Sequence, residues 1–406
     1  MGPDHDGAGA GREARAGATL SNTHPALKHC WHPVARSTEI TDRPRRVELL
    51  GDPWVLVRLK APEAGADGDL APGLYAFEDR CPHRQAPLSI GAVEDGVLRC
   101  AYHGWCFDAG GRCVDIPALG PGATLPPRAR LRAAHAVVER YGTVFLLPEE
   151  PLPGLEWLPE IAEAHDPAFL QGDLPPMRAT ACAGLLADNF LDMAHFPFVH
   201  VATFGDTEPV VPPLTVARGS GQPGDTDRWT FTAVSEHTFV NREDPGVKAG
   251  IRPLVQRRRV SYRVVAPFHL VLRLDFLDAG GTNVIGFFLQ PEHETSCRIY
   301  SSLWRDDLTG DPARMASAVD FEVRVVEEDL AIQQAYDVRA LPLDPTVEVH
   351  TRADRATLEL RRLLADLVAE VAGSAEGGVG TGAGHAGPVA LRAPAATPDA
   401  GVPARG

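Results

Sequence analysis

The chain has 406 residues, 44% of them hydrophobic and 23% charged, which is typical of a globular protein large enough for two domains. A formal net charge of −15 argues against a nucleic-acid partner held mainly by phosphate contacts, and no apolar run approaches the roughly 18 to 20 residues of a membrane span. Seven cysteines without a small-domain disulfide framework, and an N-terminus without a signal peptide's apolar core, indicate reduced thiols or metal ligands in a cytoplasmic protein.

The two ends of the chain predict disordered tails. Residues 1–22 are rich in Gly and Ala, and residues 373–406 are rich in Gly, Ala and Pro with almost no bulky apolar side chains. Between the tails we expect one domain over residues 23–150 and another over residues 151–372, because a Pro-rich connector follows residue 147.

The first domain is predicted to be small and all-β. Short apolar segments between turns predict its strands, which include Trp54–Val57, Leu74–Phe77, Val97–Leu98 and Val144–Leu147. Two of the connecting loops are rich in cysteine and histidine, and we expect the chemistry of this domain to lie there.

These loops follow the spacing C-x-H-x16-C-x-x-H, with Cys81 and His83 in one loop and Cys100 and His103 in the other. Two such pairs can clasp one small inorganic centre. The spacing suits a Rieske [2Fe–2S] cluster, in which two thiolates bind one iron and two imidazoles bind the other. A structural zinc site is the alternative, although zinc favours longer-spaced pairs such as C-x2-C with H-x3-H.

The second domain contains a segment, Asp188–His200, in which carboxylates and imidazoles stand among apolar residues. In a helix, Asp188, Asp192 and His195 would share one face. Pro197 would then disturb the helix and let His200 swing back towards His195. A metal would satisfy several of these polar groups at once. The alternative is a helix end with satisfied core histidines.

After this segment the sequence predicts a sheet and two helices. Segments 259–264, 269–274, 284–289 and 298–303 have strand character, and their succession implies an antiparallel sheet. Helices are expected over about 312–336 and 353–371, the second with a leucine-rich core stripe. The fold class is therefore α+β. The basic run 257–259 is interpreted as a solvated strand edge, with a docking surface for an acidic electron donor as the alternative.

Both motifs resemble those of the Rieske non-haem iron, or aromatic ring-hydroxylating, oxygenases. Cys81-Pro82-His83-Arg84 and Cys100–Trp105 resemble the family's Rieske domain, and Asp188–His200 resembles its catalytic motif. The resemblance covers about residues 25–370 and is nearest in pattern to the phthalate, vanillate and dicamba oxygenase branch. It implies a catalytic domain of the helix-grip (START-like) kind, with an antiparallel sheet flanked by helices.

The resemblance implies that His195 and His200 bind a mononuclear Fe(II) with a third, anionic ligand, which leaves open positions for O2 and substrate. The family takes this ligand from an aspartate on a helix far downstream. The candidates are Glu327, Glu328, Asp329 and Asp337. Asp329 is preferred because it lies in an apolar stripe, where a free carboxylate is costly, whereas Glu327 and Glu328 are interpreted as solvated.

The implied activity is that of a terminal oxygenase component. Electrons from NAD(P)H would arrive through a separate flavin/iron–sulfur reductase, directly or through a ferredoxin, since no G-x-G-x-x-G follows a predicted strand. With O2 it would hydroxylate or oxidatively demethylate an aromatic or other hydrophobic small molecule, and we favour monooxygenation over dioxygenation. The alternatives are a natural-product tailoring oxidase, which cyclises or desaturates with the same metals, and an electron-transfer Rieske protein without oxygenase activity.

The same resemblance assigns two further residues. Asp192 would link His103 of one subunit to His195 of the next, which implies a ring of subunits, most simply a homotrimer. Alternatively, Asp192 orients His195 within its own chain. Asn189 would lie near the iron, the alternative being a helix-start hydrogen bond. We expect the substrate pocket to be built from residues 196–204, the 230s and the strands around 270–290.

Overall fold

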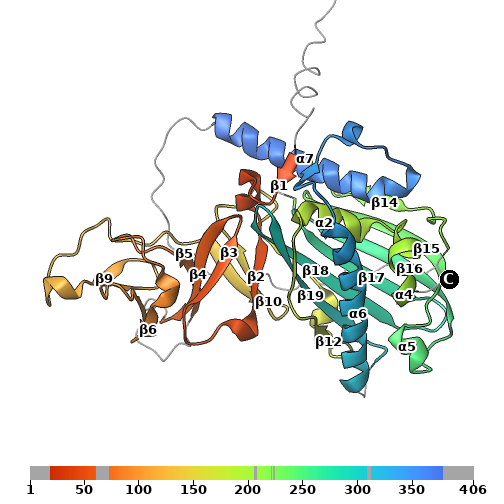
Figure 1. Cartoon of the computed structure of the whole chain (residues 1–406), viewed down its shortest axis with the longest axis horizontal. Coiled ribbons are helices and arrows are strands. Elements are labelled where there is room, and N and C mark those ends of the chain that lie inside the picture. Colours follow the sequence, from red (N-terminus) through yellow and green to blue (C-terminus); the bar gives the residue numbers. More distant parts are fainter. Residues whose placement is uncertain are drawn as a thin grey trace, which may run out of the picture.

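The structure is a computed structural model that describes residues 19–60, 73–204, 208–220, 222, 225–308 and 312–377. A group of small β-sheets forms one end of the molecule, and a large sheet with helices forms the other (Figure 1). Within the described residues, none of the helices has the length and apolar character needed to span a membrane.

The N-terminal part consists of three antiparallel sheets, with strand orders β10-β11-β2, β3-β4-β5 and β6-β7-β8-β9. The central strand β4 is almost wholly buried, because the apolar run predicted as a strand packs on both faces. The strands of the N-terminal part are β2 (His32–Arg36), β3 (Arg45–Leu49), β4 (Asp52–Leu59), β5 (Gly73–Glu78), β6 (Ala92–Glu94), β7 (Val97–Arg99), β8 (Cys106–Phe107), β9 (Cys113–Asp115), β10 (Ala136–Arg140) and β11 (Thr143–Leu147). Its short 3-10 helices are η1 (Pro25–His29), η2 (Ser37–Glu39), η3 (Leu88–Ile90) and η4 (Pro117–Leu119).

The second part is built on an eight-stranded antiparallel sheet, with the order β12-β19-β18-β17-β16-β15-β14 and β13 paired to β19. The four predicted strands are confirmed within β16 to β19. The strands are β12 (Leu170–Asp173), β13 (Met177–Ala179), β14 (Thr215–Arg218), β15 (Thr230–Val240), β16 (Val255–Val265), β17 (His269–Phe276), β18 (Thr282–His293) and β19 (Ser296–Arg305).

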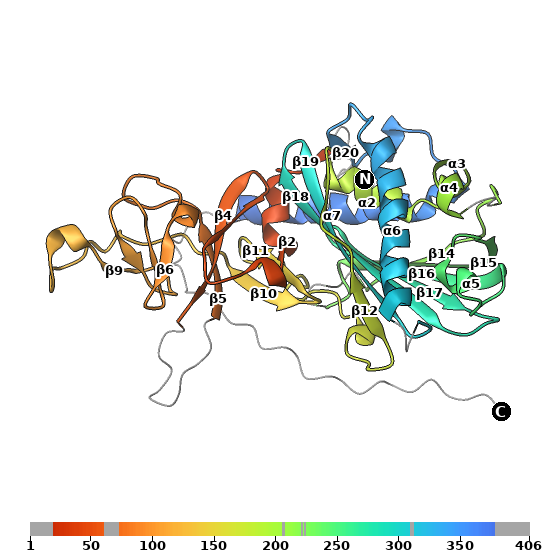
Figure 2. The same ribbon diagram turned by 60° about the horizontal axis from the view of Figure 1, so that its bottom comes forward.

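Helices complete this part: α6 crosses the sheet (Figure 2), and α7 packs against α2, β14 and β15. The predicted core stripe of α7 is confirmed at Leu363, Leu364 and Leu367, which are fully buried, whereas the predicted Leu358 is half-buried. The helices are α2 (Ala183–Leu191), α3 (Phe196–Val199), α4 (Val201–Phe204), α5 (Pro245–Lys248), α6 (Pro312–Gln333) and α7 (Arg355–Gly377), with 3-10 turns η5 (Ala162–Ala164), η6 (Pro345–Val347) and η7 (Arg352–Asp354). The α+β prediction is confirmed.

Backbone hydrogen bonds join the two parts. The tight turn between β3 and β4 donates from Leu50 N to Pro291 O and from Gly51 N to Glu292 O, both at 2.8 Å. Both turn residues have positive φ angles, 56° and 82°, which aim their N–H groups at β18. The turn therefore fixes the N-terminal part against the large sheet.

Both predicted tail boundaries need correction. Strand β1 (Thr19–Ser21) pairs with β20 (Ala340–Pro342), so residues 19–22 are not part of a disordered tail. Leu20 is fully buried, and Asn22 hydrogen-bonds the backbone of the second part, which explains why the chain is held there. At the other end α7 continues to residue 377. The rest of both predicted tails lies outside the described residues, and the remaining domain limits stay predictions.

Candidate metal centres and pocket

The four predicted cluster ligands lie on two loops at the far end of the N-terminal part. Cys81 and His83 lie between β5 and β6, and Cys100 and His103 lie between β7 and β8. The first loop is closed by a hydrogen bond from Gln85 N to Cys81 O at 2.9 Å, and a similar bond closes the second. The centroids of the two imidazole rings are 4.4 Å apart. The loops therefore bring both cysteine–histidine pairs together.

The chemistry of these side chains fits a [2Fe–2S] cluster. Burial, together with the neighbouring Cys100, raises the pKa of the Cys81 thiol to about 11. His83 Nδ1 is buried and has no hydrogen-bond partner among the described residues. Binding of iron would deprotonate the thiols and give this nitrogen a partner. Trp105 stacks on His83 with 4.6 Å between ring centroids and shields one side.

The segment that carries the two predicted iron histidines is not one helix, which corrects the prediction for Asp188–His200. Helix α2 ends before Asp192, whose backbone is extended at φ −82° and ψ 126°. The Asp192 carboxylate accepts a backbone N–H two residues later and so stabilises a tight turn. Pro197 lies in the first turn of the next helix, α3, where a missing N–H costs nothing. The break turns His195 and His200 towards a common point.

At this point the two imidazoles meet Asp329, which α6 supplies. The Nε2 atoms of His195 and His200 are 3.1 Å apart, and each lies 3.3 Å from Asp329 Oδ1. These three residues form a group whose potential ligand atoms all lie within 4.8 Å of one another. His200 and Asp329 are 1% and 3% exposed, so the carboxylate is buried as its apolar surroundings predicted. Two imidazoles and one carboxylate are the donors of a facial Fe(II) site.

The pKa values of Asp329 and His195 show how strongly the donors interact. Burial alone would raise the pKa of Asp329, but hydrogen bonds from His195 and His200 bring it below its ordinary value. Burial alone would lower the pKa of His195, yet its bonds to Asp192 and Asp329 raise it to about 9. The site thus stabilises positive charge between its donors, as a cation-binding site requires.

Asn189 holds the carboxylate of this group. Its Nδ2 donates to Asp329 Oδ1 at 2.8 Å, while its Oδ1 accepts from Gln333 Nε2 at 3.2 Å. The second bond fixes the orientation of the amide, so the N–H is the group that faces Asp329. The alternative of a helix-start hydrogen bond is wrong, because Asn189 lies in the last turn of α2.

Glu328 was wrongly interpreted as a solvated acid. Its Oε2 lies 2.8 Å from His200 Nδ1 and accepts the Thr203 hydroxyl at 2.6 Å. Its side chain is 21% exposed, whereas the adjacent Glu327 is exposed at the surface. The available signal was chemical, since a histidine that binds metal through one nitrogen needs a partner for the other.

Asp188 lies outside the metal site. Both of its carboxylate oxygens accept from Arg361 of α7, at 3.2 Å from Nε and 2.9 Å from Nη2. The guanidinium also pairs with Glu348, and Arg361 is only 4% exposed. This bidentate pair anchors α2 to α7, and so holds the helix that precedes Asp192.

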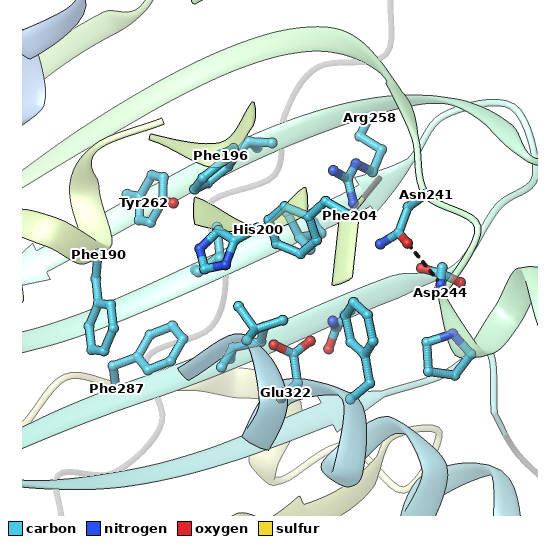
Figure 3. A pocket seen from close by; sticks show the side chains of 18 of the residues that line it. Phe190, Phe196, His200, Phe204, Asn241, Asp244, Arg258, Tyr262, Phe287 and Glu322 are labelled. Carbon is cyan, nitrogen blue, oxygen red and sulfur yellow. Dashed lines mark hydrogen bonds between the residues drawn. The ribbon is translucent and has the colours of Figure 1, made fainter. Parts of the chain in front are cut away.

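A cavity of about 90 Å³ reaches from these donors along the space between α6 and strands β15 to β18 (Figure 3). One water needs about 10–15 Å³ by this measure, so the cavity suits a small molecule. The expected walls are confirmed, with Phe196, Phe204, His237, Leu272 and Phe287 among the lining residues.

The prediction that the basic run 257–259 is a solvated strand edge also needs correction. The run lies inside β16, where side chains alternate between faces, so Arg257 and Arg259 are exposed but Arg258 is 7% exposed and lines the cavity. The run was interpreted as a strand edge because three consecutive charges hide this alternation.

Comparisons with known proteins agree with this architecture. Residues 30–134 match the Rieske [2Fe-2S] domain family, and residues 179–370 match the vanillate O-demethylase oxygenase C-terminal domain family. Methylxanthine N1-demethylase NdmA of Pseudomonas putida is 27% identical over 360 residues, covering 86% of this chain and 92% of the relative. The 4beta-methylsterol monooxygenase of Methylococcus capsulatus is 42% identical over 136 residues, which is 29% of this chain and 37% of the relative.

Solved structures share the fold. NdmA of Pseudomonas putida with caffeine superposes with a TM-score of 0.71 at 24% identity, covering 87% of this chain and 94% of that one. Dicamba monooxygenase bound to dicamba superposes with a TM-score of 0.68 at 22% identity, covering 86% and 99%.

A cluster-binding β-domain in front of a sheet-and-helix domain with a two-histidine, one-carboxylate group defines a class of iron oxidoreductases. Both halves of the chain match families of that class. The chain belongs to the Rieske non-haem iron oxygenases, as a terminal oxygenase component. Such a component works with O2 and an organic substrate and takes its electrons from separate reductase and ferredoxin proteins. The alternative of a Rieske protein that only transfers electrons is therefore excluded.

Proposed function

We propose that the two groups of side chains are the ligand sets of the two iron centres. The cluster ligands are Cys81, His83, Cys100 and His103, and the ligands of the mononuclear iron are His195, His200 and Asp329. The observation that carries the proposal is the convergence of two imidazole Nε2 atoms and one carboxylate in the wall of an apolar cavity.

When bound, the cluster supplies single electrons and the mononuclear iron activates O2. The side chains of this protein hold and orient the reactants. Asn189 orients the Asp329 carboxylate, and Glu328 accepts a hydrogen bond from Nδ1 of His200 so that Nε2 faces the cavity. The apolar walls exclude water and bind the hydrophobic body of a substrate.

The reaction we propose is monooxygenation, with oxidative removal of a methyl group as its favoured form. The match of residues 179–370 to a vanillate O-demethylase domain and the likeness to an N-demethylase over most of the chain support it. The cavity is lined mainly by apolar and aromatic side chains, which supports an aromatic or other hydrophobic substrate. The seven cysteines, all free thiols, support the predicted cytoplasmic location.

Electrons are proposed to cross between subunits of a homotrimer. The two proposed metal sites lie at opposite ends of the folded subunit. The cluster loops are next to β6 and β9, and the histidines are next to α3 and α4 (Figures 1 and 2). Asp192 contacts His195 at 3.3 Å and keeps 29% of its side chain exposed, so it can also meet a neighbouring subunit's His103. A head-to-tail ring brings such ends together.

The test uses the purified full chain loaded with iron and a surrogate reductase. The reduced protein should give the EPR signal of a histidine-ligated [2Fe–2S] cluster, and iron analysis should give three irons per chain. With a panel of methoxylated and N-methylated aromatics, the demethylated product and formaldehyde should form, and a substrate that is hydroxylated instead should carry one oxygen atom from labelled O2. A colourless zinc protein, or products that carry two labelled oxygen atoms, would contradict the proposal.

A further inference from the structure

Arg258 occupies an unusual position at the end of the cavity away from the iron donors. In the register of the sheet it lies opposite His237 of β15 and Phe276 of β17, and both neighbours line the same cavity. Figure 3 shows its side chain beside that of Asn241, beyond Phe204 as seen from His200. Arg258 is 7% exposed, so its charge is removed from bulk water.

The guanidinium lacks a partner of opposite charge. Among the described residues no carboxylate oxygen lies within 4.0 Å of Arg258, and its buried Nε has no hydrogen-bond partner. The guanidinium carbon Cζ of Arg258 lies 3.7 Å from the ring centroid of Phe239, and this cation–π contact offsets only part of the free-energy cost of burying the charge. A buried arginine in this state is poised to receive an anion.

The nearby aspartates already have other partners. Asp307 is shared by Arg252 and Arg305, with Arg305 Nη2 at 2.9 Å from Oδ2. Asp244 caps α5 by accepting two backbone N–H groups, at 2.8 and 3.0 Å. Neither carboxylate forms a direct ion pair with Arg258, although Asp244 also lines the cavity and its charge opposes the fall in the Arg258 pKa that burial causes.

Glu322 of α6 also lines the cavity, but it does not form an ion pair with Arg258. Burial raises the pKa of Glu322 to about 7, so the neutral form of this carboxyl group is well populated near neutral pH. A neutral carboxyl group can donate a hydrogen bond to an anion instead of repelling it.

A second donor stands beside the guanidinium. The Oδ1 of Asn241 accepts the backbone N–H groups of Glu243 and Asp244, at 3.0 and 2.9 Å. These bonds fix the amide so that its NH2 group remains available, and Asn241 lines the cavity with 2% exposure. Two donors therefore serve one end of the cavity.

Aromatic rings separate this end from the iron donors. The ring centroids of His200 and Phe204 are 4.7 Å apart, and those of Phe204 and Phe239 are 5.3 Å apart. Arg258 lies over Phe239. A ligand that spans the cavity must thus carry its polar group at Arg258 and an apolar body against Phe204.

We propose that the substrate is a small aromatic or otherwise apolar carboxylic acid, whose carboxylate binds Arg258 and Asn241 while the carbon to be oxidised faces His195, His200 and Asp329. The inference rests on the proposed function for the orientation of the substrate. The recognition of the acid by Arg258 rests on the cavity alone and is tested without turnover.

The test is calorimetric titration of the oxidised holoprotein, without reductant, with matched pairs of acids and their neutral amides. The probes are 3- and 4-methoxybenzoate, phenylacetate and 1-naphthoate with the corresponding carboxamides. The wild type should bind at least one acid about tenfold or more tightly than its amide, and Arg258→Met should lose about tenfold or more for that acid but little for the amide. Arg258→Lys should recover part of the preference.

Arg257→Met is the matched control, because this neighbouring arginine is exposed and pairs with Asp278 at 3.1 Å on the other face of β16. It should bind the acids as the wild type does. Asn241→Ala should weaken acid binding and provides a second variant if Arg258→Met does not fold. The inference is overturned if amides bind as tightly as acids, if Arg258→Met keeps the preference, or if no acid binds. A preference for acids without any oxidised or demethylated product would contradict the oxygenase function only.

Discussion

The Nδ1 atom of His200 lies 2.8 Å from Glu328 Oε2, and this contact connects the proposed iron site to the residue next to its carboxylate ligand. It holds the Nδ1 side of the ring on Glu328, so that Nε2 is the nitrogen that faces Asp329 and the proposed iron. Glu328→Ala should therefore weaken mononuclear iron binding by about 10- to 100-fold, the usual effect of losing such a partner. Iron content after dialysis against a chelator measures it.

Glu327→Ala is the matched control for that variant, since Glu327 is exposed one position earlier on α6. It should keep full iron, and both variants should keep the EPR signal of the cluster. Equal iron retention in the two variants would show that Glu328 does not support His200.

Asp329 is the proposed third ligand, because its Oδ1 lies 3.3 Å from both imidazole nitrogens. Asp329→Ala should keep the cluster spectrum but lose mononuclear iron and turnover, since two imidazoles alone do not provide the anionic ligand. Asp337→Ala, at an exposed position, should retain both. An active Asp329→Ala enzyme would show that Asp329 is not the third iron ligand.

Asp192 contacts His195 within the chain and remains partly exposed. Asp192→Asn should leave both metal centres loaded but slow the transfer of electrons from cluster to iron by roughly tenfold or more, as expected when a hydrogen-bonded carboxylate next to a ligand is lost. Rapid mixing of the reduced, substrate-bound protein with O2 follows the cluster spectrum directly. An unchanged rate would mean that Asp192 only shapes the turn after α2.

A mixture of two inactive variants tests whether electrons cross between subunits. His103→Ala should lack the cluster and Asp329→Ala should lack the mononuclear iron, so neither should turn over alone. Co-expressed in equal amounts, they should form mixed rings with about a quarter of the wild-type activity, the random share of interfaces that pair an intact cluster with an intact iron site. An inactive mixture would indicate transfer within one chain.

Two buried histidines near the join of the two parts predict acid sensitivity. Burial lowers the pKa of His32 to about 4 and that of His269 to about 3, from 6.5. Below pH 6.5 each of these histidines binds a proton in the unfolded chain but stays neutral in the folded protein. The free energy of unfolding is therefore highest above pH 6.5, and each histidine lowers it by about 1.4 kcal/mol for every unit by which the pH falls. That fall ends near the folded-state pKa values.

His269→Gln isolates one of these contributions. Its Nε2 lies 3.0 Å from Trp31 O, so the variant is also expected to be less stable at neutral pH. Between pH 7.5 and 5.5, however, the wild type should lose about 1.4 kcal/mol more than the variant in urea unfolding. Equal losses would show that His269 takes up a proton in the folded protein.

The sequence by itself determined the features that depend on short stretches of chain. The pairs Cys81–His83 and Cys100–His103 are each close in sequence, so the loop that carries a pair also brings its donors together. The strands β16 to β19 were predictable because their apolar and β-branched character is local. His195 and His200 were recognisable by their spacing, although the helix around them was not.

Only the tertiary structure decided which distant groups meet. Asn189 and Glu328 gained their roles because α6 crosses the sheet next to α2 and α3, and no local pattern fixes that crossing. Arg258 faces the cavity while its two arginine neighbours face solvent, because a shift of one residue in the register of β16 would reverse all three. Register and helix packing are set by the whole core, and it is these long-range contacts that complete the site.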